Sequence, residues 1–143
     1  MQLTHPRPPR TPRQDALATG VRFASEIAVE ALHAAADDRR FIHEQEWGQS
    51  DHDTLADIDD TLQGLASWVV GGMPHPQPAR VLNTLREQQR TTFDLRALLQ
   101  GKHQQSSKLP DYVDRLEELR LALLEFFGNS DESSVHGSSP ASQ

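Results

Sequence analysis

The sequence contains no cysteine, and this absence excludes disulfide scaffolds, thiolate metal sites and cysteine nucleophiles. It also lacks any apolar run near the roughly 20 residues that a membrane-spanning helix needs. Residues 1–14 are charged but lack the apolar stretch of a signal peptide. We therefore expect a cytoplasmic protein without a membrane segment.

Several motifs of common enzymes are missing as well. The chain has no G-x-S-x-G nucleophile elbow. Gly71 and Gly72 are followed by Met73 and Pro74, without the lysine of a phosphate-binding loop. The sequence does not exclude an enzyme but indicates none, and we expect neither catalytic residues nor a cofactor.

The net charge of -7 disfavours nonspecific binding to nucleic acid by the whole molecule, since phosphate affinity comes chiefly from Lys and Arg. Arginine outnumbers lysine 12 to 2, a bias typical of GC-rich bacterial or phage genomes. Arg7, Arg10 and Arg13 lie among four prolines, which predicts a disordered, solvated arm over residues 1–14. The alternative is an arm that touches an acidic partner or nucleic acid.

Between this arm and a Ser-rich tail, residues 128–143, which we expect to be disordered, the apolar residues recur every three or four positions. This spacing predicts one helical domain over residues 15–127 with four amphipathic helices. The helices are expected at residues 15–46, 51–70, 78–100 and from Pro110 onward. Short connections place successive helices side by side, so we expect an all-α, antiparallel four-helix bundle with a long first helix.

We expect the last helix to contribute the largest apolar side chains to the core and the first helix the smallest. The last helix carries its apolar face on Tyr112, Val113, Leu116, Leu119, Leu123, Phe126 and Phe127. The stripe of the first helix is mostly alanine, which lets a neighbouring helix approach closely. Phe23, Val29 and Phe41 fall away from that stripe, and exposed apolar side chains there favour a homodimer or a partner groove.

An E-x-x-H motif, Glu30 to His33, has half of the spacing that a di-iron carboxylate bundle needs. On a helical wheel, however, Glu26, Glu30 and His33 lie opposite the alanine stripe. If the alanines face the core, these side chains face water, and we expect no metal. The alternative is a metal enzyme in the bundle interior with these three residues as candidate ligands.

Charge divides sharply between the second and third predicted helices. Residues 51–72 hold five Asp and no Lys or Arg, whereas residues 78–102 hold five basic residues and two acids. Attraction between neighbouring helices explains this division without a partner. The alternative is a surface for a basic partner, because Asp53, Asp57 and Asp60 share one outward wheel position where like charges repel.

Arg80, Arg86 and Arg90 likewise form a predicted basic ridge for an acidic protein or nucleic acid. The ridge shows no exposed aromatics between its arginines, which argues against single-stranded nucleic acid. We therefore expect a noncatalytic protein-protein interaction module, such as an adaptor, inhibitor, regulator or assembly subunit, that acts through charged helix faces. The alternatives are a nucleic-acid-binding regulator, which would use the arginine arm and the ridge, and the metal enzyme.

Overall fold

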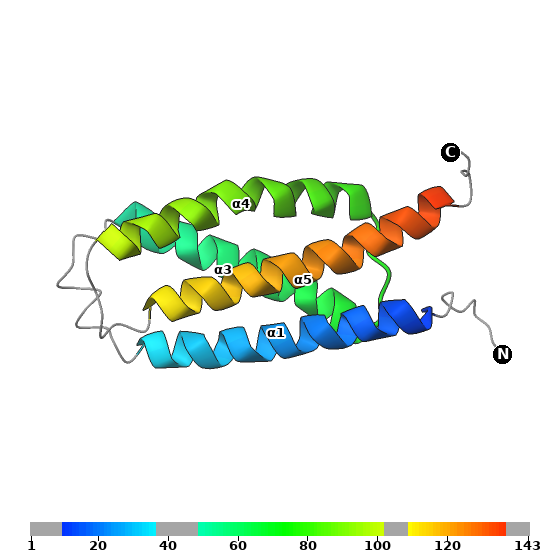
Figure 1. Ribbon diagram of the computed structural model, residues 1–143, viewed down its shortest axis with the longest axis horizontal. Helices are drawn as coiled ribbons and strands as arrows, with labels where there is room; N and C mark the ends of the chain where they lie inside the picture. The colour runs from blue at the N-terminus through cyan, green and yellow to red at the C-terminus, as the bar shows by residue number, and fades with distance from the viewer. Residues whose placement is uncertain (1–9, 37–48, 102–108, 137–143) are drawn as a thin grey trace.

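The computed structural model describes residues 10–36, 49–101 and 109–136. The helices are α1 (Pro12–Ala36), α3 (Gln49–Gly71), α4 (Pro78–Gly101) and α5 (Leu109–His136). Successive helices run in opposite directions along one long axis (Figure 1). No strand occurs in these three segments, and the predicted all-α, antiparallel bundle of four helices is confirmed.

The first helix begins at Pro12 because residues 11–14 form a capping box. The Thr11 hydroxyl accepts a hydrogen bond from the Gln14 N–H (3.1 Å), and the Gln14 side chain accepts one from the Thr11 N–H (3.0 Å). Pro12 takes the first helical position, where a missing N–H is not needed. The boundary predicted at Asp15 is thus corrected to Pro12, and residues 1–9 of the predicted arm lie outside the described residues.

The described residues test the predicted end of α5 but not that of α1. The described part of α1 stops at Ala36, and its predicted continuation to Glu46 lies outside the described residues. Among the described helices α5 is the longest, with 28 residues against 25 in α1. It runs to His136, into the segment predicted as a tail, because no further glycine or proline follows Gly128 until Gly137.

Helix α5 is the centre of the bundle, since it packs along both α1 and α4 and also contacts α3. Its predicted apolar face is buried in full: Tyr112, Val113, Leu116, Leu119, Leu123, Phe126 and Phe127. Burying a leucine side chain completely contributes about 1.5–3 kcal/mol before entropy costs. The apolar face of α5 is therefore the main source of the core.

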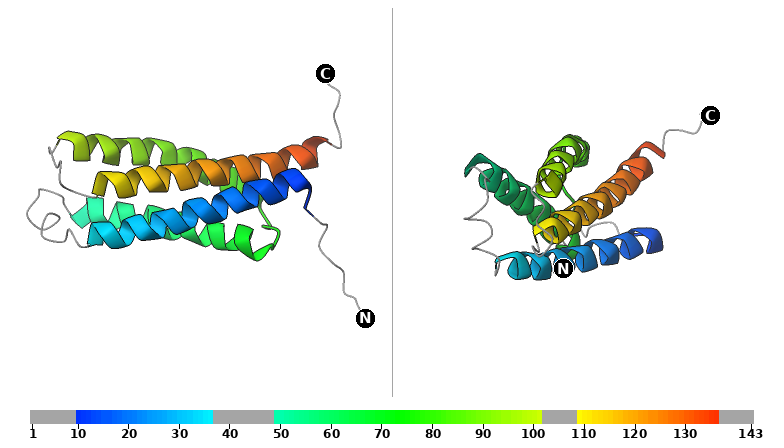
Figure 2. Two further views of the ribbon diagram at one scale, coloured as in Figure 1. Left: turned by 60° about the horizontal axis from the view of Figure 1, so that its bottom comes forward. Right: turned by 60° about the vertical axis from the view of Figure 1, so that its left-hand side comes forward.

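The alanines of α1 face inward, as the helical wheel predicted. Ala28, Ala31 and Ala35 are buried, and so is Val21. Their short side chains let α1 lie close beside α5, and the two helices run together in Figures 1 and 2. The α1 side of this interface therefore consists mainly of small side chains, which pack against the larger apolar side chains of α5.

Helices α3 and α4 contact each other far less than α4 and α5 do. One face of α3 is buried nonetheless: Leu55, Ile58, Leu62, Leu65 and Val69. On α4, Val81 and Leu85 are buried, and so is the polar Thr92. None of the described helices is apolar over enough length to cross a membrane.

A Schellman motif ends α3. The N–H of Gly72 donates to the Val69 carbonyl (3.1 Å) and the N–H of Met73 donates to the Trp68 carbonyl (3.3 Å). Gly72 adopts the left-handed φ of 78° that this motif requires. The Arg10 guanidinium adds a hydrogen bond to the same Val69 carbonyl (2.6 Å).

Two glycines of the α3 segment should respond to alanine in opposite directions. Gly72→Ala should lower the free energy of unfolding by about 1–2 kcal/mol, because a left-handed φ strains any side chain with a Cβ. Gly64→Ala should raise it by about 0.5–1 kcal/mol, because glycine weakens a helix interior. An added Cβ at Gly64 meets no atom within 4 Å. Urea denaturation of both variants tests this pair, and changes of the same sign would contradict it.

Candidate functional site

A buried arginine joins α5 to α4. Arg120 is only 1% exposed, and its guanidinium lies in the apolar interior. Its Nε and Nη2 donate to the two carboxylate oxygens of Glu117, at 2.8 and 2.6 Å, and its Nη1 donates to the Leu85 carbonyl of α4 at 3.0 Å. A buried cation needs such partners, since an unpaired one is costly to desolvate. The Arg120 contacts therefore hold the two helices in one register.

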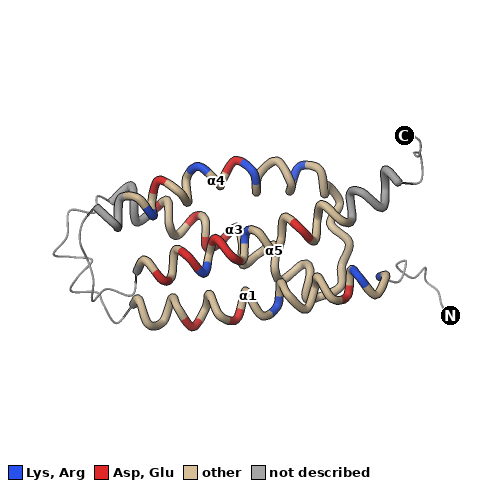
Figure 3. Tube along the Cα trace, in the orientation of Figure 1, with Lys and Arg blue, Asp and Glu red and all other residues tan. Residues whose placement is uncertain are grey.

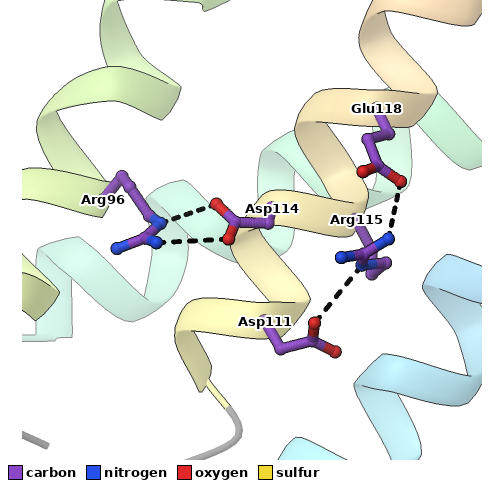
Figure 4. A network of polar contacts seen from close by, with 5 residues as sticks. All are labelled: Arg96, Asp111, Asp114, Arg115 and Glu118. Atoms are coloured by element: carbon purple, nitrogen blue, oxygen red, sulfur yellow. Dashed lines mark hydrogen bonds and ion pairs between the residues drawn. The ribbon is translucent and has the colours of Figure 1, made fainter.

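A second paired arginine joins the same helices nearer the start of α5. Arg96 of α4 binds both carboxylate oxygens of Asp114, at 2.6 and 3.2 Å (Figure 4). Arg115 points to another side of α5, where it pairs with Asp111 and Glu118 of its own helix (Figure 4). Two parallel hydrogen bonds fix the orientation of the Arg96 and Asp114 side chains relative to each other. Both side chains border the outer surface between α4 and α5.

That outer surface is a groove with a cavity volume of about 450 Å³. Its α4 wall includes Arg86, Arg90, Phe93 and Arg96, and its α5 wall includes Asp114 and Glu117. Buried Val113 and Thr92 lie beneath. A volume in this range suits a ligand or a few side chains of a partner. We call this feature the α4–α5 groove.

The groove is electropositive along its α4 wall. Both of its α5 carboxylates are already paired, Asp114 with Arg96 and Glu117 with Arg120. Arg86 has no ion pair within the described part of the chain, and Arg90 reaches only Asp94, at 3.7 Å between two exposed side chains. Such exposed pairs contribute about 0–1 kcal/mol. Arg86 and Arg90 are therefore available to an acidic group from outside.

Phe93 lies on the same wall and is 69% exposed. It lies three residues beyond Arg90 and three before Arg96, so it stands next to the predicted ridge of Arg80, Arg86 and Arg90 rather than between those arginines. Sequence spacing did not single out Phe93. The available signal was a phenylalanine on α4 away from the buried positions Val81, Leu85 and Thr92.

The structure brings together only part of the predicted basic ridge. Arg86 and Arg90 line the groove, but Arg80 lies near the start of α4 and donates to the Gln77 side chain at 3.2 Å. Figure 3 shows basic residues recurring along α4. Arg96, which was not part of the predicted ridge, also belongs to the groove wall.

The predicted acidic residues of α3 form a separate surface. Asp53, Asp57 and Asp60 are all exposed, and none of them lines the α4–α5 groove. Asp57 and Asp60 have no ion pair with another described residue, so attraction between α3 and α4 does not account for them. Their outward orientation is as predicted.

The E-x-x-H residues do not converge with other ligands. Glu26, Glu30 and His33 are exposed on the outer side of α1, as the wheel predicted. Within the described ranges, no group of three or more His, Asp or Glu side chains is placed to hold a metal ion. Glu26, Glu30 and His33 are therefore not joined by a further ligand from another described helix.

Two arginines of the predicted arm contact the bundle. The Arg10 guanidinium lies over the Phe126 ring at 5.1 Å, in addition to its bond to Val69. The Arg13 side chain donates to Asn129 at 3.0 Å. Arg7 lies outside the described residues. These contacts occupy two of the three arginines that a nucleic-acid-binding arm would use.

A half-buried carboxyl between α3 and α5 was not predicted. The Tyr112 hydroxyl donates to Asp59, while Asp59 Oδ1 is buried with no hydrogen-bond partner in the described segments. Burial raises the pKa of Asp59 above its ordinary 3.8; the Tyr112 bond opposes this shift, and neighbouring Asp60 adds to it. Burial and Asp59 also raise the pKa of Tyr112. Asp59 is a destabilising feature of the interior at neutral pH.

Comparison of the chain with protein-family models, with curated proteins and with solved structures gives no match. The α4–α5 groove is therefore the candidate functional site. Its decisive residues are Arg86, Arg90 and Phe93. Only the two arginines were candidates from sequence.

Glu117→Ala should destabilise the protein strongly, because it leaves the buried Arg120 guanidinium without its carboxylate. We expect the free energy of unfolding to fall by about 3–5 kcal/mol. Glu118→Ala is the matched control, since Glu118 makes only an exposed pair with Arg115 and should contribute about 0–1 kcal/mol. Urea denaturation measures both, and equal losses would contradict the structural role of Arg120.

Asp59→Asn should change how stability depends on pH. Because folding raises the pKa of Asp59, the folded chain binds more protons above pH 3.8 than the unfolded chain does. The stabilisation from protonated Asp59 is complete below that pH and is lost as pH rises through the folded-state pKa. The Asp59→Asn variant should therefore gain stability relative to the parent protein as pH rises. Denaturation from about pH 3 upward tests this, and a gain that is constant with pH would refute it.

Proposed function

We propose that this protein is a noncatalytic helical-bundle interaction module, acting as an adaptor, inhibitor, regulator or assembly subunit. We propose further that a partner protein binds in the α4–α5 groove. The observation that carries this proposal is the exposure of Phe93 beside two arginines without strong ion pairs, Arg86 and Arg90. The site of action that composition favours is the cytoplasm.

The residue types in the groove support a protein partner. Arginine and aromatic residues contribute most binding energy at protein interfaces, particularly where a ring is available for burial. The walls are positioned in advance by the Arg120 and Arg96 contacts, so little ordering is required on binding. A rigid groove with an exposed ring and positive charge suits an acidic protein surface.

Two other surfaces extend this proposal. The exposed carboxylates of Asp53, Asp57 and Asp60 are a candidate contact for a basic partner. Phe23 of α1 is 52% exposed, and Ile27 lies exposed one turn later, which favours α1 as the face of a homodimer. Neither surface has the pre-positioned cavity of the groove.

A photo-cross-linking residue can locate the partner surface. We expect benzoylphenylalanine at position 93, introduced in the cells that express the protein, to cross-link one protein reproducibly. The same residue at position 23 is the matched control, because Phe23 is also an exposed phenylalanine but lies on α1. Arg86→Glu together with Arg90→Glu should reduce the cross-link at position 93 at least tenfold, since charge steers and holds an acidic partner.

Three outcomes would count against this function. No cross-link at position 93, or one that survives the double charge reversal, would remove the groove as the interface. Cross-linking of position 93 to nucleic acid would favour the regulator that uses the arginines of α4.

A further inference from the structure

The α4 wall of the groove is about three helical turns long. Arg86, Arg90, Phe93 and Arg96 follow each other at spacings of four, three and three residues, so they share one side of the helix. At 1.5 Å per residue, this row extends about 15 Å along the axis. An occupant that follows the row must therefore be elongated and parallel to α4.

Backbone chemistry favours a helix as that occupant. Both walls are α-helices, and their N–H and C=O groups are already bonded within the helices. An extended peptide would find no strand edge to pair with, and its own backbone groups would lose water without replacement. A helix satisfies its own backbone and presents only side chains. The groove between two antiparallel helices is also a natural seat for a third.

One exposed apolar side chain lines the groove, and a second lies on α5 beyond the lining residues. Phe93 lines the α4 wall and is 69% exposed. Leu121 lies one helical turn beyond the lining residue Glu117 and is 48% exposed. Val113 lies buried beneath the groove. An occupant with apolar side chains one and two turns apart would cover these groups from water.

The positive charge of the α4 wall indicates that the side of the occupant facing that wall is acidic. Arg86 and Arg90 stand on the α4 wall, and the groove carboxylates on α5 are already paired with Arg96 and Arg120. This positive wall belongs to a chain whose net charge is -7. Two available arginines suit carboxylates of a peptide better than nucleic acid, whose affinity grows with the number of phosphates neutralised.

We infer that the α4–α5 groove binds an acidic amphipathic helix of a partner protein. The helix places an apolar stripe, at spacings of three and four residues, over Phe93 and Leu121, and it turns its acidic flank toward Arg86 and Arg90. This inference rests on the proposed function, and it specifies the secondary structure and the charge of the partner segment.

A selection from a library of random 15-residue peptides, displayed against the full chain, tests the inference. Enriched peptides should be acidic, should carry apolar residues at helical spacing, and should gain helical circular dichroism on binding. A proline in the middle of a selected peptide should weaken binding at least tenfold. Enrichment of basic peptides, enrichment without helical spacing, or no enrichment would each overturn the inference.

Charge-reversal variants show whether the selected peptides use the groove. Arg86→Glu with Arg90→Glu should weaken binding at least tenfold. Arg22→Glu with Arg80→Glu is the matched control, since it changes the net charge equally at exposed sites outside the groove, and it should change binding less than threefold. Peptides in which lysines replace the acids should regain binding to the groove variant, which excludes unfolding as the cause. Equal loss in both variants, or no such rescue, would contradict the inference.

The two proposals fail separately. If cross-linking at position 93 identifies a partner that depends on Arg86 and Arg90 while the selected peptides are not acidic helices, the groove is an interface but its occupant is of another kind. If acidic helices are selected yet bind equally well to the groove variant, the helix preference belongs to another surface and the inference is wrong. Preferred binding of a single-stranded oligonucleotide over the selected peptides would also overturn it.

Discussion

The Arg120 guanidinium is the constraint on which the arrangement of α4 and α5 depends. It lies in an apolar interior, where a cation is tolerated only if carboxylate and carbonyl oxygens replace its water. Glu117 of its own helix and the Leu85 carbonyl of α4 supply these oxygens. The carbonyl belongs to the backbone, so a shift of α5 along α4 would break the bond. The buried Arg120 charge therefore favours one register between the two helices, together with the Arg96–Asp114 pair.

The Arg120 contacts also shape the α4–α5 groove on the surface of the bundle. Glu117 and Asp114 line it but are held by Arg120 and Arg96, so they shape the α5 wall without giving it free negative charge. The opposite wall keeps Arg86, Arg90 and Phe93 exposed. The Arg96–Asp114 and Arg120–Glu117 pairs therefore lie along the boundary of α4 and α5, whereas Arg86 and Arg90 extend toward water. A surface built in this way is rigid and electropositive, the combination that favours an acidic protein partner.

Sequence periodicity correctly predicted burial where it depends only on which face of its own helix a residue occupies. The apolar face of α5 and the inward alanines of α1 were both predicted, because an amphipathic helix turns its apolar face to the core and its polar face to water. The start of α1 was placed too late, although Thr11 and Gln14 form a recognisable capping box. The extension of α5 to His136 was missed because composition, here rich in serine, is a weaker guide than position after an established helix.

The sequence by itself determined the class of fold, the direction in which each helix face points and the presence of arginines on α4, because these properties depend on neighbours three and four residues away. Only the tertiary structure decided that Arg120 is buried, that Asp59 meets Tyr112, and that Arg86, Arg90 and Phe93 border one groove with α5. These relations join residues of different helices. Their pairing depends on the register and angle at which the helices pack, which no spacing along a single helix encodes.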